Sequence, residues 1–128
     1  MASAGMVVDT SIFIEYLRSR DRENTALANL PSDAVLHVSV VTVFELYSGA
    51  TDLSKKMDID TLLMGVFVLP LNAEIAKNAG FIYQDLRRKG KMIEVTDILI
   101  AATALGNNLA VKTLNVEHFQ RIQGLTVL

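Results

Sequence analysis

The 128-residue sequence contains no cysteine, only two prolines and only two histidines. The absence of cysteine excludes disulfide bonds and thiolate metal sites. Because His37 and His118 are the only imidazoles, a metal site in this chain would depend mainly on oxygen ligands. Oxygen ligands favour Mg²⁺ or Mn²⁺ over Zn²⁺.

Long apolar runs are also absent, since polar or charged residues interrupt every stretch before the ~18 residues needed to span a bilayer. Residues 1–5 have neither the basic flank nor the apolar core of a signal peptide. We therefore expect an added leader or a disordered N-terminus at residues 1–5, a folded domain over residues 6–128, no membrane association and a cytoplasmic location. The net charge of −2 gives no general attraction for nucleic acid, so RNA binding would require a local basic patch.

Hydrophobic residues make up 51% of the chain, which is typical of one globular domain with a substantial core. Short apolar runs predict strands at residues 6–8, 34–39, 66–69, 109–112 and 125–128. Between them, helical spacing predicts helices that begin after Thr10 or Ser11 and that cover residues 25–30, 40–50, 52–64, 73–89 and 97–105. Strands that alternate with helices indicate an α/β fold, with a central parallel sheet flanked by helices on both faces.

Three carboxylates lie beside residues that must be buried. Asp9 ends the first apolar run, Glu45 interrupts an apolar helix, and Asp97 begins a helix that is apolar nearly all round. Burying an unpaired carboxylate costs several kcal/mol or forces its protonation. Two carboxylates ~5 Å apart repel each other by ~3 kcal/mol at an effective dielectric of ~20. A shared divalent cation would remove this cost, so we predict a metal site.

Each acidic residue also has a simpler explanation. Asp9 could cap a helix, Glu45 could lie on the surface, and Asp97 could stabilise the first turn of a helix capped by Thr96. Asn115 could likewise cap a short helical turn. The position of Asp9 and Asn115 after predicted strands nevertheless favours a site, because ligands of parallel α/β sheets bind beyond the carboxyl ends of the strands.

Four segments carry a family resemblance: VVDTSIFIEYL at residues 7–17, SVVTVFELYSG at 39–49, TDILIAATA at 96–104 and VKTLNVEHF at 111–119. In their order and spacing, the chain resembles the PIN-domain ribonucleases, and among them the VapC-like toxins of type II toxin–antitoxin pairs. The resemblance covers essentially residues 6–128.

The resemblance implies an endoribonuclease that depends on Mg²⁺ or Mn²⁺ and hydrolyses RNA phosphodiesters with metal-activated water. Asp9, Glu45 and Asp97 match the family's acidic positions and are the expected metal ligands. Asn115 stands where the family often has Asp, which weakens the case for a tightly held second ion. Thr113 matches a hydroxyl residue that orients a carboxylate or water. The implied partners are the RNA substrate, a small antitoxin that wraps a helical groove, and a second copy of the chain in a homodimer.

Two further expectations concern the surface. Part of the apolar set Ile12, Phe13, Tyr16, Leu17, Phe44, Tyr47, Leu62 and Leu63 could form a groove for a partner helix, although each of these residues could equally be core. RNA could be bound by one of two cationic clusters, formed by Arg18, Arg20 and Arg22 or by Arg87, Arg88, Lys89 and Lys91. We expect His118 to be a surface or structural residue and not a catalytic one. A catalytically idle PIN-fold module that binds RNA or protein remains the alternative to a nuclease.

Overall fold

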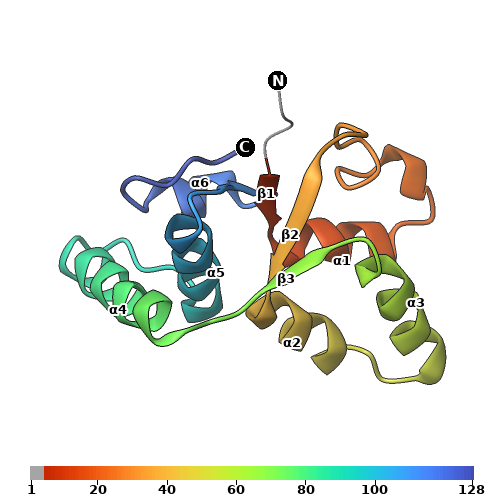
Figure 1. Cartoon of the computed structure of the whole chain (residues 1–128), viewed down its shortest axis with the longest axis horizontal. Helices are drawn as coiled ribbons and strands as arrows, with labels where there is room; N and C mark the ends of the chain where they lie inside the picture. Colours follow the sequence, from red (N-terminus) through yellow and green to blue (C-terminus); the bar gives the residue numbers. More distant parts are fainter. Residues whose placement is uncertain (1–4) are drawn as a thin grey trace.

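The computed structural model describes residues 5–128. At its centre lies a four-stranded, fully parallel sheet with the strand order β3-β2-β1-β4, and Figure 1 shows it between two groups of helices. The strands are β1 (Gly5–Val8), β2 (Val35–Ser39), β3 (Phe67–Leu69) and β4 (Ala110–Lys112). The chain builds outward from β1 through β2 and β3, and then returns to place β4 on the other side of β1.

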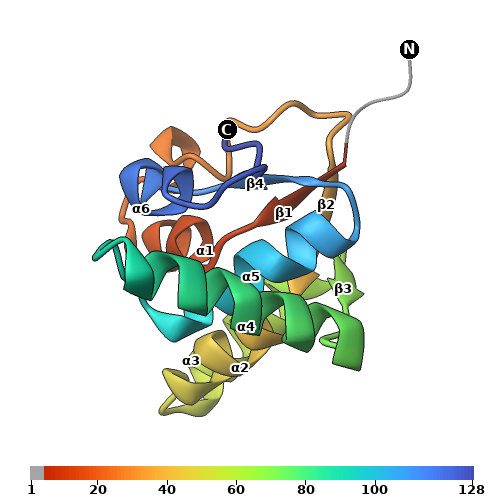
Figure 2. The same ribbon diagram turned by 90° about the vertical axis from the view of Figure 1, so that its left-hand side faces the viewer.

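The helices form two layers. One face of the sheet carries α1 (Thr10–Arg18), α2 (Val40–Ser48) and α3 (Leu53–Leu63), and the other carries α4 (Ala73–Arg88), α5 (Val95–Gly106) and α6 (Val116–Gln120). A short 3₁₀ helix, η1 (Arg22–Asn24), follows α1. Figure 2 shows α4 lying along α5 on the outside of the second layer.

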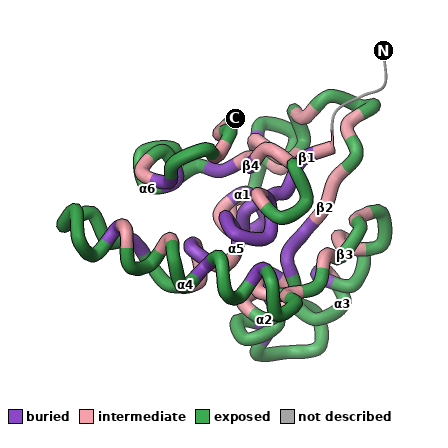
Figure 3. The backbone as a smooth tube through the Cα atoms, turned by 60° about the vertical axis from the view of Figure 1, so that its left-hand side comes forward, coloured by how far each residue is buried: buried purple, intermediate pink, exposed green. Residues whose placement is uncertain are grey.

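Side chains along β1 alternate between two hydrophobic clusters, one on each face of the sheet. Met6 and Val8 pack into the cluster formed with the first helix layer, whereas Val7 packs into the cluster of the second layer. This division follows from the period of two along a strand, because successive side chains point to opposite faces of the sheet. Helix α5 is the most completely buried helix, as Figure 3 shows, and its small residues let it lie close to the sheet.

Polar side chains fix where several helices begin. Ser39 accepts a hydrogen bond from the backbone nitrogen of Val41 at the start of α2, and Asp52 and Asn72 do the same for α3 and α4. These contacts satisfy backbone donors that have no partner inside the helix. Because Ser39 is both the last residue of β2 and the cap of α2, the strand passes directly into the helix that carries Glu45.

The structure confirms the predicted α/β class, with a parallel sheet covered on both faces. Two predicted elements are wrong. Residues 25–30 form turns, in which the backbone nitrogen of Asn29 donates to Thr25 and Ala26 and its side chain bonds the carbonyl oxygens of Glu23 and Thr25. Residues 125–128 make only an isolated parallel bridge between Val127 and Val111.

Of the predicted N-terminal leader, residues 1–4 lie outside the described residues, whereas Gly5 pairs with Val35 in the sheet. The boundary at residue 6 therefore stays a prediction. Over the described residues, no helix combines the length and the apolar character that crossing a membrane requires.

Candidate functional site

The carboxyl end of β1 brings together residues from distant parts of the sequence. The chain leaves β1 toward one side of the sheet and enters β4 on the other, so this end of β1 is the point where the strand order reverses. Open parallel sheets bind ligands at such points. Asp9 follows β1 directly, and its backbone nitrogen donates to the carbonyl oxygen of Lys112 at 2.9 Å, which fixes it beside the end of β4.

Asp9 is the most deeply buried of the predicted acidic residues, with 1% of its surface exposed. It occupies the cap position of α1 but makes no capping hydrogen bond, so the simple cap interpretation is wrong. Its Oδ2 instead accepts hydrogen bonds from Ser11 Oγ at 2.6 Å and from Thr113 Oγ1 at 2.8 Å. No donor among residues 5–128 reaches the buried Oδ1. One oxygen of this carboxylate is therefore held by the protein, and the other has no partner.

Glu45 lies on α2 and is only partly buried. Its Oε1 accepts a hydrogen bond from Thr10 Oγ1 at 2.7 Å, and Thr10 Oγ1 is also 2.8 Å from Thr42 Oγ1. Thr10 is the residue that follows Asp9, so this contact ties α2 to the end of β1. The alternative of a surface glutamate is wrong, because the carboxylate is held against a buried hydroxyl.

Asp97 lies in the first turn of α5 and is half-buried. Burial, followed by repulsion from Asp9, Glu45 and Glu94, raises the pKa of the Asp97 carboxyl from 3.8 to about 6. The structure thus brings all three predicted acidic residues close enough to interact electrostatically. Helix α5 begins at Val95, one residue before the predicted cap Thr96, and Glu94 holds the cap position without a side-chain bond.

Sequence reasoning missed Glu94 and Ser11 as members of this cluster. Ser11 Oγ bonds Asp9 and also accepts a hydrogen bond from the backbone nitrogen of Leu114 at 3.1 Å. A signal was present in each case. Ser11 is two residues from Asp9, a spacing at which a hydroxyl often bonds a neighbouring carboxylate, and Glu94 stands three residues before Asp97, within one helical turn.

The two remaining predicted residues differ in their surroundings. Thr113 is buried, bonds Asp9, and accepts a hydrogen bond from the backbone nitrogen of Asn115 at 2.9 Å. The Asn115 side chain is exposed and, although it stands at the cap position of α6, it makes no capping bond. His118 is exposed on α6.

The donor chemistry of this cluster fits a hard divalent cation. It consists of carboxylate groups. Asp9 has a buried oxygen without a partner, and burial, followed by repulsion from anionic neighbours, raises the pKa of the Asp97 carboxyl. Within residues 5–128, no three Asp, Glu or His side chains lie close enough to hold one ion jointly. Sharing an ion would thus require the side chains to draw closer, which a cation would promote by replacing their repulsion with attraction.

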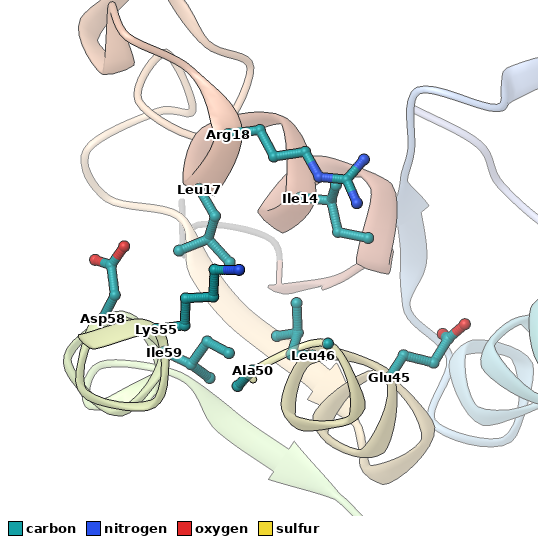
Figure 4. A pocket seen from close by; sticks show the side chains of 10 residues that line it. Ile14, Leu17, Arg18, Glu45, Leu46, Ala50, Lys55, Asp58 and Ile59 are labelled. Atoms are coloured by element: carbon teal, nitrogen blue, oxygen red, sulfur yellow. The ribbon is translucent and has the colours of Figure 1, made fainter. Parts of the chain in front are cut away.

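A pocket of about 320 Å³ opens beside Glu45, between α1, α2 and α3. Figure 4 shows apolar side chains inside it, with Arg18 and Lys55 on its walls and Glu45 at the end nearest the C-terminal half of the chain. Of the residues predicted to form a groove, Leu17 lines this pocket. Ile12 and Phe13 are fully buried and cannot contact a partner, so for these two the alternative of core packing holds.

Three of the seven residues in the predicted cationic clusters form ion pairs. Arg88 and Lys89 both contact Asp85, at 2.6 and 2.9 Å, and Arg22 contacts Asp58 at 2.7 Å. Arg18 lines the same pocket as Glu45. Of the predicted cations, Arg18 thus shares a pocket with Glu45, a member of the carboxylate cluster.

Comparison with known proteins identifies the family of this chain. The family model described as PIN domain matches residues 6–125. The chain belongs to the PIN domain family. Among its relatives, Ribonuclease VapC10 of Mycobacterium tuberculosis is 33% identical over 120 residues, which cover 94% of this chain and 90% of the relative. The predicted resemblance to PIN-domain, VapC-like proteins is thereby confirmed.

Solved structures give the same result. VapBC-1 from nontypeable Haemophilus influenzae matches with a TM-score of 0.81 and 30% identity, covering 97% of this chain and 96% of that chain. VapBC2 from Rickettsia felis, solved with a DNA fragment from its promoter, matches with a TM-score of 0.84 at 22% identity, with 97% of both chains covered. At that identity, the second match supports the PIN fold alone.

Proposed function

We propose that this PIN-domain protein is an endoribonuclease dependent on Mg²⁺ or Mn²⁺, acting in the cytoplasm as the toxin of a toxin–antitoxin pair. The observation that carries the proposal is the buried, half-satisfied Asp9 beside Asp97, whose carboxyl pKa is raised to about 6. A folded protein bears the cost of such unpaired acids most readily where function needs them. The names of its relatives, ribonucleases called VapC, support the choice of substrate.

In this proposal Asp9, Asp97 and Glu45 would hold the metal, and Asn115 would assist with a neutral, weaker oxygen ligand. When bound, the ion would polarise a phosphoryl oxygen and lower the pKa of the attacking water. Ser11 and Thr113 hold Oδ2 of Asp9 and keep its Oδ1 free for this purpose. His118 is exposed on α6, where the proposed reaction does not require it.

The main experiment is cleavage of total cellular RNA by the purified protein, with cut sites mapped in Mn²⁺, in Mg²⁺ and in EDTA. We expect cleavage with either ion and none in EDTA. A lack of cleavage with both ions, together with an unchanged melting temperature at millimolar metal, would instead favour an idle PIN-fold module that binds RNA or protein.

The proposed antitoxin would bind the pocket between α1, α2 and α3. Among solved structures with this fold, one is described as a member of the VapBC family of toxin–antitoxin systems and another as a toxin–antitoxin complex. The pocket combines an apolar interior with the charged side chains of Arg18, Lys55 and Asp58. These features suit an amphipathic protein segment. Because Glu45 lines the same pocket, an occupant would also cover one of the proposed metal ligands.

Two neighbouring lysines on α3 allow a matched test of this docking site. Lys55 lines the pocket and Lys56 does not, although both are exposed. The binding partner for this test is a protein encoded by a short reading frame next to this gene. We expect Lys55→Glu to weaken its binding by about tenfold, as reversal of a charge at an interface does. Lys56→Glu should leave affinity unchanged. Equal affinities in titration calorimetry would argue against this docking site.

We extend the proposal to a homodimer. Several large apolar side chains are strongly exposed, among them Phe44 at 68%, Phe67 at 62% and Phe81 at 56%. Burying such side chains against a second copy of the chain would remove their apolar surface from water, which favours association. Light scattering on the isolated protein should give twice the mass of one chain, and a single-chain mass at all concentrations would contradict the dimer.

A further inference from the structure

Thr10 occupies an unusual place, since it follows Asp9 and contacts Glu45, two of the proposed metal ligands. We infer that Thr10 is a positioning residue, which orients Glu45 for cation binding through a directional chain of hydroxyl groups from Thr42 to Thr10 to Glu45. This inference rests on the proposed function, since it concerns the same carboxylates. It adds two residues that touch neither metal nor RNA in that proposal.

The direction of the chain follows from the number of protons available. An ionised carboxylate can only accept hydrogen bonds, so the single proton of Thr10 Oγ1 goes to Glu45 Oε1 at 2.7 Å. The contact of 2.8 Å between Thr10 Oγ1 and Thr42 Oγ1 must then use the Thr42 proton. Thr42 donates to Thr10, and Thr10 donates to Glu45.

The burial of Thr42 and Thr10 indicates that these hydroxyl groups do more than fill space. Thr42 is 0% exposed and Thr10 is 6% exposed, and valine would fill the same volume without a buried hydroxyl. Threonines within helices commonly bond a carbonyl oxygen four residues back, as Thr61 and Thr103 do here. The hydrogen bond found for Thr42 instead crosses to α1, at the residue that holds Glu45.

The same pattern recurs at Asp9. Ser11 and Thr113 both bond Oδ2 of Asp9 and leave Oδ1 without a donor, and Thr10 bonds Oε1 of Glu45. For Oε2 of Glu45, no protein donor is found within residues 5–128. Hydroxyl groups thus fix one oxygen of each carboxylate and leave the other available. Groups that orient ligands in this way strengthen metal binding without contacting the ion.

The test measures Mn²⁺ binding to the metal-free protein by electron paramagnetic resonance, which detects the free ion and requires no RNA. Thr10→Val removes the hydroxyl at constant volume, and we expect it to weaken Mn²⁺ binding by about tenfold. Thr10→Ser keeps the hydroxyl and should stay within about twofold of the unaltered protein. Thr103→Val is the matched control, because it removes a buried hydroxyl that bonds only the carbonyl oxygen of Leu99.

A second variant guards against a folding defect. If Thr10→Val does not give the far-UV circular dichroism of the unaltered protein, Thr42→Val takes its place. That variant keeps the bond to Glu45 but removes the donor that orients Thr10, and about a threefold loss of Mn²⁺ affinity is expected.

The possible failures can be told apart. If the unaltered protein binds no Mn²⁺, the proposed function fails, and this inference fails with it. If the unaltered protein binds Mn²⁺ and the folded variant of Thr10 or Thr42 binds it equally well, the inference fails alone. An equal loss in Thr103→Val would also overturn it, because the effect would then be general to buried hydroxyls.

Discussion

Two aspartates on neighbouring helices show how differently the molecule treats the same side chain. Asp85, near the end of α4, contacts Arg88 and Lys89, and these cations hold the pKa of its carboxyl below the usual value. Asp97, in the first turn of α5, has anionic neighbours and partial burial, and the pKa of its carboxyl rises to about 6. The protein's own cations pair with Asp85, whereas no ion pair forms at Asp97 within residues 5–128.

The strongest test of this contrast is RNA cleavage. Asp97→Asn should reduce cleavage by roughly a thousandfold, since losing a ligand removes several kcal/mol of transition-state stabilisation. Asp85→Asn, which makes the same chemical change in an ion pair at the surface, should leave the rate unchanged. Single-turnover cleavage of a labelled RNA measures the rates of both variants. Equal rates would show that Asp97 is no more important for cleavage than Asp85.

Metal ions should stabilise the folded protein through the unpaired acids. At a concentration near 100 times the Kd, Mn²⁺ should add about 3 kcal/mol to the free energy of unfolding. Thermal melting with increasing Mn²⁺ measures this gain. Asp85→Asn should retain it and Asp97→Asn should lose most of it, while the same gain in both would place the ion elsewhere.

Without metal, the unpaired acids should cost stability. Because Asp97 is forced to ionise among anions at pH 7, Asp97→Asn should raise the free energy of unfolding of the metal-free protein by about 2 kcal/mol. A raised pKa means that the folded protein binds a proton more tightly than the unfolded chain. The stability of the unaltered protein should therefore fall as pH rises from about 4 to about 6, then level off.

Chemical denaturation in EDTA across this pH range measures the effect, and the fall between pH 4 and pH 6 should be smaller in Asp97→Asn. Asp85→Asn should leave that fall intact, because the lowered pKa of Asp85 makes its stabilisation disappear only as the solution becomes more acidic. A profile that is identical in all three proteins would show that Asp97 has an ordinary pKa.

The smallest expected effect concerns Glu94, which contributes least to the raised pKa of Asp97. The substitution Glu94→Gln removes this charge and should lower the pKa of Asp97 by a few tenths. The effect is small because solvent screens an exposed neighbour. Carbon-13 titration of the Asp97 carboxyl in the metal-free protein measures this shift. A shift larger than that produced by Glu45→Gln would reverse the order of the two neighbours.

The sequence alone predicted the fold correctly where neighbouring residues decide the secondary structure. The short apolar run at residues 6–8 predicted a strand buried on both faces, and the alternation of strands with helices predicted a parallel sheet. It failed at residues 25–30 and 125–128. In those segments, apolar content resembles a regular element, but side-chain bonds to the backbone or a lack of strand partners decide the conformation.

For the candidate site, the sequence by itself determined which carboxylates were candidate metal ligands, because burying an acid within an apolar run is costly unless it has a partner. The resemblance implied that Thr113 orients a carboxylate or water, but not that this carboxylate belongs to Asp9. Nothing in the sequence paired Thr10 with Glu45 either, since the two pairs are separated by 104 and 35 residues along the chain. Only the tertiary structure decided those partnerships. A hydrogen bond requires two atoms within about 3 Å, and folding brings atoms that far apart in sequence to such a distance.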